Sequence, residues 1–381
     1  MTRKRHRVGS HRALPPEETL ARITPHLRSF GITRAADVTG LDLLGIPVYC
    51  AVRPRGGLLQ VANGKGLRDI DAKVSALMEA IEYWHAEHPP AELLRASYEA
   101  LAATAPACPP DALPWFRGGA FDARRLVLPW VLGDDLGDGA PIWVPAGAAW
   151  DLEPRLFEWS TNGLASGNTL AEATLHALLE VYERHALARL LDADGAVDLD
   201  VAEVLDLADA PGPSLGALRA RIEAAGLRAV LLRVPSGGPI EVFAAALLDR
   251  DAFAASTLVN LGYGAHLCHE VAAVRAITEA AQQRATYIHG SRDDLPRRGY
   301  DEAPKRRLYD RFAALSPGRP WSDLADASTG DLDDDLALAL AALPGAGLGA
   351  CRRIVLSPPE LPVTVVKVLV DGAEMRFARL M

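Results

Sequence analysis

The sequence is poor in cysteine, and the few cysteines present are far apart. Its 381 residues include only Cys50, Cys108, Cys268 and Cys351, and no two of them form a CxxC pair. A structural zinc site usually needs such pairs, and a small disulfide-stabilised domain needs a higher density of cysteine. We therefore expect reduced thiols in a cytoplasmic protein, without a disulfide framework or a structural zinc.

Long apolar runs and an excess of positive charge are also missing. The apolar stretches are too short or too interrupted to span a bilayer. The basic start MTRKRHRVGSHR is not followed by the apolar segment of a secretory signal. The formal net charge of −9 opposes general binding to nucleic acid, which requires a basic surface. We expect a protein that binds neither a membrane nor a nucleic acid.

No phosphate-binding loop or metal-binding cluster of a familiar spacing is present. The stretch Asn63-Gly64-Lys65-Gly66 lacks the spacing of a Walker loop, so by itself it predicts a turn rather than a phosphate cradle. His266, Cys268 and His269 are close in sequence but have no partner pair at zinc spacing. We therefore predict structural or pocket-lining roles for these three residues.

The sequence does contain enough apolar material for a large core, and it alternates between strand and helix patterns. Apolar residues make up 49% of the chain. Apolar and β-branched runs predict strands at 46–54, 58–66, 228–235, 240–248 and 361–372. Helical patterns include 70–87, a segment from Asn168 towards Leu191, a third long helix after 261–264, and a surface helix at 331–343. This order predicts an α/β fold with mixed, mostly antiparallel sheets packed with long helices.

Polar side chains recur at helical spacing in the three long helices. The sets are Ser75, Glu79 and Glu82; Asn168, Glu172, Glu180, Glu183 and Arg184; and Arg275, Glu279 and Gln282. Such spacings place side chains on one helical face, and the surrounding positions are mostly apolar, so we expect these faces to be buried. Buried carboxylates need cations, and Mg²⁺ with a polyphosphate supplies them because hard oxygen ligands suit that ion. The chain is predicted to be a nucleotide-using enzyme.

Simpler interpretations compete with this one. A single helical glutamate such as Glu82 or Glu183 usually faces solvent. The complete set is harder to explain in this way, because helices rich in Ala and Leu leave little other polar surface. His176 and His185, on the second of the three helices, could carry protons near neutral pH or serve in helix packing.

Four specific segments follow one another along the chain: ADVTGLDLLGIPV, GKGLRDIDAKVSALMEAIE, STNGLASGNTLAEATLHALLEVYERHAL and RAITEAAQQRATYIHGSRDDL. With the opening HRALPPEETLARI and the terminal LPVTVVKVLV, they cover nearly the whole chain. In this order they resemble the YcaO-domain family, whose members are ATP-dependent enzymes that activate peptide backbone amides. The opening and the first segment most resemble the stand-alone branch associated with a TfuA-like partner and thioamide formation.

This resemblance implies a reaction that uses ATP and Mg²⁺. A nucleophile adds to an amide carbon, the resulting oxygen attacks the γ-phosphate of ATP, and collapse expels phosphate. Catalysis of this kind depends on positioning and electrostatics. The family also implies a YcaO-type fold around a central nucleotide cleft and a homodimer. We divide the chain into an N-terminal helix and strands at 1–60 and a continuous catalytic domain at 61–381.

The resemblance also implies roles for individual residues. The residues that match the magnesium-binding glutamates, and that we predict to be catalytic, are Glu79, Glu82, Glu180 and Glu183. Glu172 and Glu279 match further acidic positions, which we also expect near the metal. The residues expected at the nucleotide are Ser75, Asn168, Arg184, Arg275, Glu279 and Gln282, with Arg12 and Lys65 able to reach the phosphates.

The chain departs from the family pattern at one position. Where the family usually reads ExxER in the first long helix, this chain has Glu82-Tyr83. Loss of that arginine could weaken the pairing with phosphate or change the substrate pocket. The second helix keeps Glu183-Arg184, so we still expect nucleotide binding.

The predicted function is thioamide formation on a ribosomally made precursor peptide, with a TfuA-like sulfur-handling partner. Azoline formation by cyclodehydration, macroamidine formation and peptide-bond cleavage would use the same site with another nucleophile. The ending AEMRFARLM lacks the PxPxP tail of many azoline-forming members, which disfavours that alternative. In another class of function, the chain would be a non-catalytic peptide-binding scaffold, but the full set of glutamates opposes this hypothesis.

Overall fold

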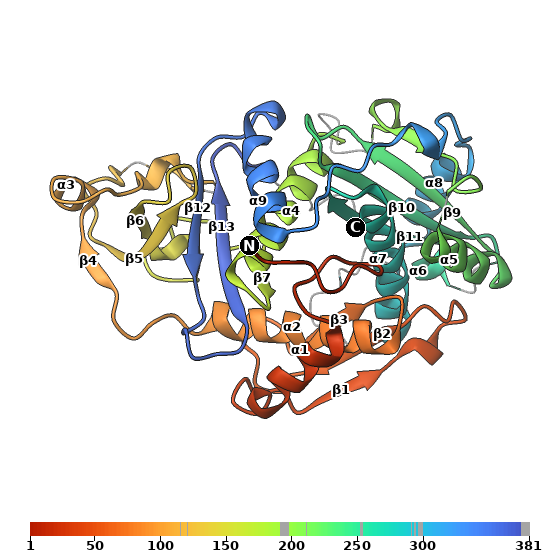
Figure 1. The fold of residues 1–381 in the computed structure, drawn as a ribbon, viewed down its shortest axis with the longest axis horizontal. Coiled ribbons are helices and arrows are strands. Elements are labelled where there is room, and N and C mark those ends of the chain that lie inside the picture. The colour runs from red at the N-terminus through yellow and green to blue at the C-terminus, as the bar shows by residue number, and fades with distance from the viewer. Residues whose placement is uncertain are drawn as a thin grey trace.

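The computed structural model describes residues 1–114, 116–119, 121–190, 198–210, 212–251, 254–290, 292, 295 and 300–374. The strands of this part of the chain form three sheets, and the neighbouring strands within each sheet run antiparallel. Long helices pack against these sheets (Figure 1). The predicted α/β fold with mostly antiparallel sheets is therefore confirmed.

The first sheet comes from the N-terminal part of the chain. Helix α1 (Pro16–Ile23) begins with proline and carries Glu17 and Glu18 in its first turn, where acidic side chains are favoured. The sheet has the order β1-β2-β3, formed by β1 (Arg34–Asp37), β2 (Val48–Val52) and β3 (Val61–Lys65). Helix α2 (Asp69–Glu87) covers it (Figure 1). β2 and β3 pair across the predicted boundary at residue 60, and the division itself stays a prediction.

The second sheet has six strands and brings together distant parts of the chain. Its order is β4-β5-β12-β13-β7, with β6 paired to β5. These strands are β4 (Leu94–Ala96), β5 (Leu128–Asp135), β6 (Pro141–Pro145), β7 (Leu164–Gly167), β12 (Cys351–Val355) and β13 (Thr364–Val370). The accompanying helices are α3 (Tyr98–Ala102), α4 (Leu170–Ala188) and α9 (Leu332–Ala341). Because α4 packs on β13 and α9 packs on α4, these elements form successive layers.

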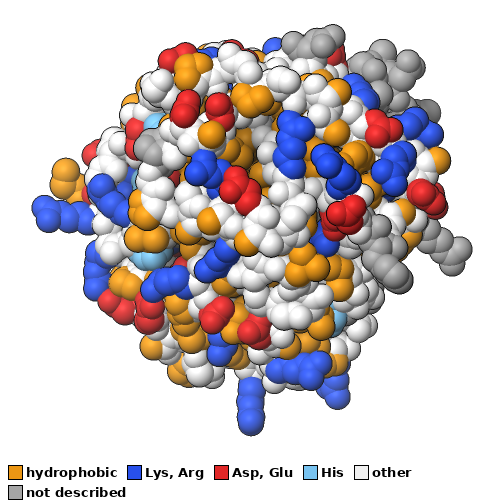
Figure 2. All heavy atoms as spheres, turned by 90° about the vertical axis from the view of Figure 1, so that its right-hand side faces the viewer, with side chains coloured by type: hydrophobic (Ala, Val, Ile, Leu, Met, Phe, Trp, Pro, Cys, Tyr) orange, Lys and Arg blue, Asp and Glu red, His pale blue; other side chains and the backbone are white. Residues whose placement is uncertain are grey.

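The third sheet has the order β11-β10-β9-β8. Its strands are β8 (Glu203–Leu205), β9 (Leu227–Val234), β10 (Glu241–Asp249) and β11 (Val259–His266). The helices around it are α5 (Pro213–Ala224), α6 (Ala255–Leu258), α7 (His269–His289) and α8 (Glu302–Ala313). Helix α7 runs back along β11 and β10. Figure 2 views the molecule from this side and shows acidic and basic side chains interspersed on the surface.

Each of the three long helices follows the strand at one end of its sheet. The units are β3–α2, β7–α4 and β11–α7, and a glycine in each strand lets the helix approach closely. A Cβ on Gly64 would lie 2.0 Å from Ala76 N, and one on Gly167 would lie 2.5 Å from Ala173 N. Asn63, Gly64 and Lys65 belong to β3, so the strand predicted at 58–66 is confirmed here and the turn that 63–66 predicts by itself is wrong. Close packing, rather than a turn, accounts for this glycine.

Two other sequence predictions need correction or restriction. Helix α9 confirms the helix predicted at 331–343, but it is not simply a surface helix, because Leu332, Asp335 and Ala339 are buried. Helix α4 ends at Ala188, and residues 191–197 and the tail 375–381 lie outside the described residues. In the described part of the chain, every helix falls short of the length or apolar character needed to cross a membrane.

Candidate functional site

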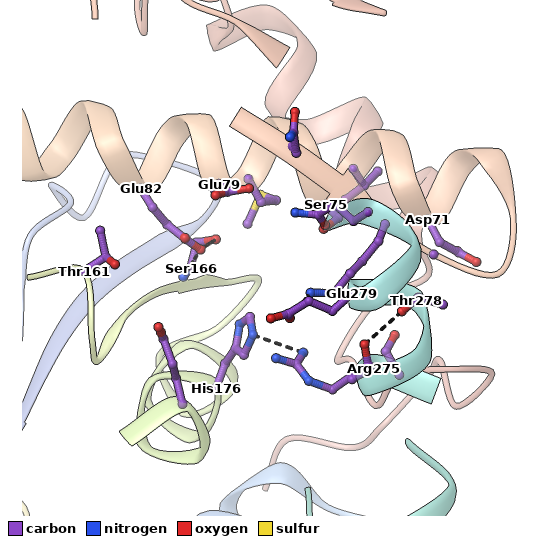
Figure 3. A pocket seen from close by; sticks show the side chains of 18 of the residues that line it. Asp71, Ser75, Glu79, Glu82, Thr161, Ser166, His176, Arg275, Thr278 and Glu279 are labelled. Atoms are coloured by element: carbon purple, nitrogen blue, oxygen red, sulfur yellow. Dashed lines mark hydrogen bonds and ion pairs between the residues drawn. The ribbon is translucent and has the colours of Figure 1, made fainter. Parts of the chain in front are cut away.

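All of the sequence-predicted site residues line one cavity of about 770 Å³. The cavity lies where α2, α4 and α7 meet, and the N-terminal segment contributes to its wall. The predicted residues in its lining are Arg12, Lys65, Ser75, Glu79, Glu82, Asn168, Glu172, Glu180, Glu183, Arg184, Arg275, Glu279 and Gln282. Figure 3 shows side chains from the three helices directed into this space. Residues spread over more than half of the sequence thus form one site.

Helix α2 supplies Ser75, Glu79 and Glu82 along one side of the cavity (Figure 3). The Glu82 carboxylate accepts two hydrogen bonds from Ser166, one from the backbone N at 2.7 Å and one from Oγ at 2.5 Å. Burial raises the pKa of Glu82 to about 8, although these hydrogen bonds oppose the rise. Glu82 therefore accepts the hydrogen bonds that Ser166 of β7 donates, while its carboxyl group remains in the cavity lining.

Helix α4 begins with a hydrogen-bonded cluster around Glu172. Thr169 caps the helix by accepting a hydrogen bond from Glu172 N at 3.2 Å. The Glu172 carboxylate accepts hydrogen bonds from Asn168 Nδ2 at 3.1 Å and from Ala13 N at 2.8 Å, and Arg12 Nη1 lies 3.7 Å from it. Because these contacts already neutralise and occupy Glu172, it is the least available of the predicted metal ligands.

Further along α4, two acidic side chains flank an arginine. Arg184 Nε lies 3.7 Å from Glu180 and 3.6 Å from Glu183. Burial raises the pKa of Glu180, and it raises the pKa of Glu183 to about 7 even though Arg184 opposes the shift. A carboxyl group with this pKa is poised to lose its proton when a cation arrives.

Helix α7 contributes one basic and one acidic side chain to the cavity, Arg275 and Glu279. Lys65 Nζ forms an ion pair with Glu279. Burial alone would raise the pKa of Glu279, but Lys65 and Arg184 outweigh burial and lower it. Arg275 Nη1 lies 3.3 Å from His176 Nε2 (Figure 3). Burial and the neighbouring arginines hold the pKa of His176 well below its ordinary value, so His176 accepts this hydrogen bond as a neutral imidazole.

The other histidines considered in the sequence have packing roles. His185 Nε2 contacts Ala346 O at 3.1 Å, and its Nδ1 accepts a hydrogen bond from Glu374 N at 3.2 Å. His266 Nδ1 accepts a hydrogen bond from Cys268 N at 2.9 Å, and His269 packs edge-on against Trp321. The predicted structural roles of His266 and His269 agree with these contacts.

The charged side chains of the cavity suit Mg²⁺ that arrives with a polyphosphate better than a metal ion held by protein ligands alone. The six predicted glutamates share the cavity with the cations Arg12, Lys65, Arg184 and Arg275. Among the described residues, no three acidic, histidine or cysteine side chains are close enough together to hold a metal by themselves. Mg²⁺ takes one or two carboxylates and completes its shell with water and phosphate oxygens. The carboxylates present therefore fit Mg²⁺ with a nucleotide.

The affinity for Mg²⁺ with AMPPCP is expected to rise as the pH increases from about 6 to about 8.5, because Mg²⁺ binds ionised carboxylates. With pKa values of about 7 and 8, Glu183 and Glu82 are mainly protonated at the lower pH and lose their protons across this window. Calorimetric titration at several pH values measures the effect. Because the nucleotide itself titrates, Glu82→Gln is the control, and it should give a flatter profile. An equal dependence of the affinity on pH in the wild type and in Glu82→Gln would contradict this role of the Glu82 carboxyl group.

Tyr83, where the chain departs from the family pattern, also lines the cavity. Tyr83→Arg is expected to change ATP affinity less than tenfold, or about 1.4 kcal/mol, because Arg184 and Arg275 already supply cations. Peptide-dependent ATP consumption should change more, since arginine adds a permanent charge and five donors. ATP affinity and ATP consumption are measured with and without peptide, and Tyr83→Phe serves as the control. A tenfold or larger gain in ATP affinity would identify position 83 as a nucleotide contact.

Ser166 and Lys367 are among the residues of the site region that were missed in the sequence. Ser166 donates two hydrogen bonds to Glu82, and the only sequence signal was its place before Gly167 and Asn168. Lys367 is buried in β13, where its Nζ donates hydrogen bonds to Ser160 O and Asn162 O of the cavity wall. Burial lowers the pKa of Lys367 to about 7. A single lysine in the apolar run 363–370 was the available signal.

A family model and several relatives match most of the chain. The family model, described as YcaO cyclodehydratase and as ATP- and Mg²⁺-binding, matches residues 63–374. A protein of Mycobacterium tuberculosis is 36% identical over 388 residues, which cover 98% of this chain and 84% of the relative. A protein of Rhizobium leguminosarum bv. trifolii, named for its position in the tfuA 3′ region, is 34% identical over 96% of this chain and 89% of its own length.

Solved structures agree with this relationship. YcaO from Methanopyrus kandleri, bound with AMPPCP and Mg²⁺, matches with a TM-score of 0.77 and 26% identity over 98% of this chain and 95% of that chain. A heterocyclase in complex with substrate and cofactor shares the fold, with a TM-score of 0.78 and 22% identity over 100% of this chain and 54% of that chain. The chain therefore belongs to the YcaO family of ATP-dependent, Mg²⁺-binding enzymes of the cyclodehydratase type.

Proposed function

We propose that this protein uses ATP to activate backbone amides of a ribosomally made precursor peptide, and that it forms thioamides with a TfuA-like sulfur-handling partner. The observation that carries the proposal is the single cavity in which carboxylates from three helices meet cationic side chains. The Rhizobium leguminosarum relative named for the tfuA 3′ region supports the choice of a TfuA-like partner.

Within this proposal, the glutamates that would hold Mg²⁺ come from α2 and α4, namely Glu79, Glu82, Glu180 and Glu183. Glu279 would lie near the metal but already pairs with Lys65, and Glu172 already contacts Arg12, Ala13 and Asn168. The nucleotide contacts are Ser75, Asn168, Arg184, Arg275 and Gln282, with Arg12 and Lys65 towards the phosphates. Bound ATP with Mg²⁺ supplies the phosphoryl group that turns the amide oxygen into a leaving group.

The chain's own residues contribute orientation and fixed charge to this reaction. Arg184 is held between Glu180 and Glu183, so its charge stays in the cavity. Neutral His176 fixes one end of Arg275 without adding a competing positive charge. Fixed groups of this kind stabilise developing charge without reorganising during the reaction. The proposed mechanism therefore needs no covalent protein nucleophile.

Reconstitution tests the proposal. The purified chain, the TfuA-like protein and precursor peptide of its gene neighbourhood, sulfide, ATP and Mg²⁺ are combined, and the peptide is examined by mass spectrometry. We expect exchange of one oxygen for sulfur at a backbone amide, and ¹⁸O placed in that amide should appear in the released phosphate. Loss of water without gain of sulfur would instead identify cyclodehydration. ATP consumption that leaves the phosphate unlabelled would contradict amide activation.

A further inference from the structure

One wall of the cavity is an N-terminal strap, defined here as residues 4–13. Arg12 N donates to His6 O at 3.0 Å and His6 N donates to Arg12 O at 3.1 Å, which closes a loop over residues 6–12. Val8, Gly9 and Ser10 of this loop line the cavity together with His6 and Arg12. Figure 1 shows the strap crossing the molecule from the side of α9 towards α1.

The first end of the strap is held by a fully buried ion pair and by a backbone hydrogen bond from Lys4 N to Gly330 O at 3.2 Å. Lys4 Nζ pairs with Asp335 of α9, and both side chains are 0% exposed. Lys4 Nζ also donates to Thr329 O at 2.9 Å and contacts His11 Nδ1 at 3.0 Å. The second oxygen of Asp335 accepts hydrogen bonds from Thr329 N at 2.7 Å and Thr329 Oγ1 at 2.9 Å. Every polar group of the pair is therefore satisfied.

The second end of the strap meets α4 at the cavity. Ala13 N donates to Glu172 at 2.8 Å, and Arg12 lies 3.7 Å from the same carboxylate. Helices α4 and α9 pack together, and Tyr182 Oη of α4 donates to Ala339 O of α9 at 2.9 Å. The strap is thus attached at its two ends to two helices that are fixed to each other.

We propose that Lys4 and Asp335 are positioning residues for the nucleotide cavity, because they set the register of the strap and hold Arg12 at Glu172. A buried ion pair adds little stability compared with an apolar pair of the same size. Because its two charges must meet each other, however, it favours one position of the strap relative to α9. Without it, the strap could shift along α9 and displace Arg12 from the cavity. This inference rests on the nucleotide site proposed above.

The test replaces the ion pair by apolar side chains. The double variant Lys4→Met/Asp335→Leu keeps side chains of similar length and branching at both positions and leaves no unpaired charge. We expect faster amide hydrogen exchange at residues 5–13 and a loss of affinity for Mg²⁺ with AMPPCP of about tenfold, within the usual range for coupling between sites. The control is Arg5→Ala/Glu18→Ala. It removes a half-exposed ion pair between the strap and α1, in which Arg5 Nη2 lies 2.6 Å from Glu18 Oε1, and it should leave both the exchange rate and the affinity unchanged.

Wild-type exchange and wild-type affinity in the folded double variant would overturn the positioning role. Thr329→Val gives a second variant that keeps the ion pair itself. It removes the Oγ1 hydrogen bond to Asp335 and the Oγ1 contacts with the backbone of Asp331, and it should shift both quantities in the same direction by less. If the unmodified protein failed to bind Mg²⁺ with AMPPCP, the proposed nucleotide site would be wrong. Hydrogen exchange at residues 5–13 would still decide whether the ion pair holds the strap.

Discussion

Glu183→Gln is expected to reduce ATP turnover at least 100-fold, at the lower end of the roughly 10²–10³-fold losses seen when one electrostatic contact of a reacting site is removed. Glu183 is 2% exposed, faces the cavity, and lies 3.6 Å from Arg184. Glutamine keeps the shape of the side chain but cannot neutralise Mg²⁺ or balance Arg184. Glu180→Gln should have a comparable effect. Peptide-dependent phosphate release measures both variants.

The loss of turnover should not come from unfolding. Burial raises the pKa of Glu183 above its value in the unfolded chain, so the ionised carboxylate opposes folding as the pH rises through about 7. Glutamine has no proton to lose, and Glu183→Gln without nucleotide should therefore be at least as stable as the wild type at pH 8. Glu223→Gln on α5 is the matched control at an exposed ion pair. Full turnover in Glu183→Gln would contradict the metal-binding role.

Gly262→Ala is expected to lower the free energy of unfolding by about 3 kcal/mol, at the upper end of usual overpacking costs. The added Cβ would lie 2.1 Å from Ala280 N and 2.3 Å from Ala276 O. Both atoms belong to the backbone of α7, so the helix must move away from β11 to make room. That movement would also displace Arg275 and Glu279, and nucleotide affinity should fall with stability.

Denaturant unfolding measures this effect, and Gly216→Ala supplies the comparison. Gly216 lies in α5, and nothing lies within 4 Å of the position that its Cβ would take. Alanine there should stabilise the protein slightly, since glycine costs roughly 1 kcal/mol in a helix interior. An unfolding midpoint for Gly262→Ala equal to that of the wild type would show that α7 can be moved without cost.

The acidic side chains that α2, α4 and α7 direct into the cavity could be predicted from the sequence, because the helical spacing already selects one face of each helix. The spacing of Glu79 and Glu82, and of Glu180 and Glu183, places each pair on the same side of its helix. The apolar surroundings indicate that these faces are buried. Spacing within a single helix does not show where the other helices lie. The expectation that the three helical faces meet came from the resemblance to the family. The same resemblance supplied Arg12 and Lys65.

Contacts between distant segments could not be predicted in this way. Lys65 and Glu279 are separated by 214 positions, and Lys4 and Asp335 by 331, so no local pattern connects either pair. The turn predicted at 63–66 failed for a related reason. Local chemistry associates glycine with turns, whereas Gly64 is required because the distant backbone of α2 lies against β3. Ser166 was missed because its role depends on Glu82, in another unit of the fold.

We propose that carboxylates from α2 and α4 bind the nucleotide through Mg²⁺ in this one cavity. Calorimetric titration of the wild-type protein with AMPPCP, with Mg²⁺ and with a chelator in its place, measures whether nucleotide binding needs the metal. We expect binding that depends on Mg²⁺ and is lost in Glu183→Ala. Equal affinity with and without Mg²⁺, retained in that variant, would contradict it.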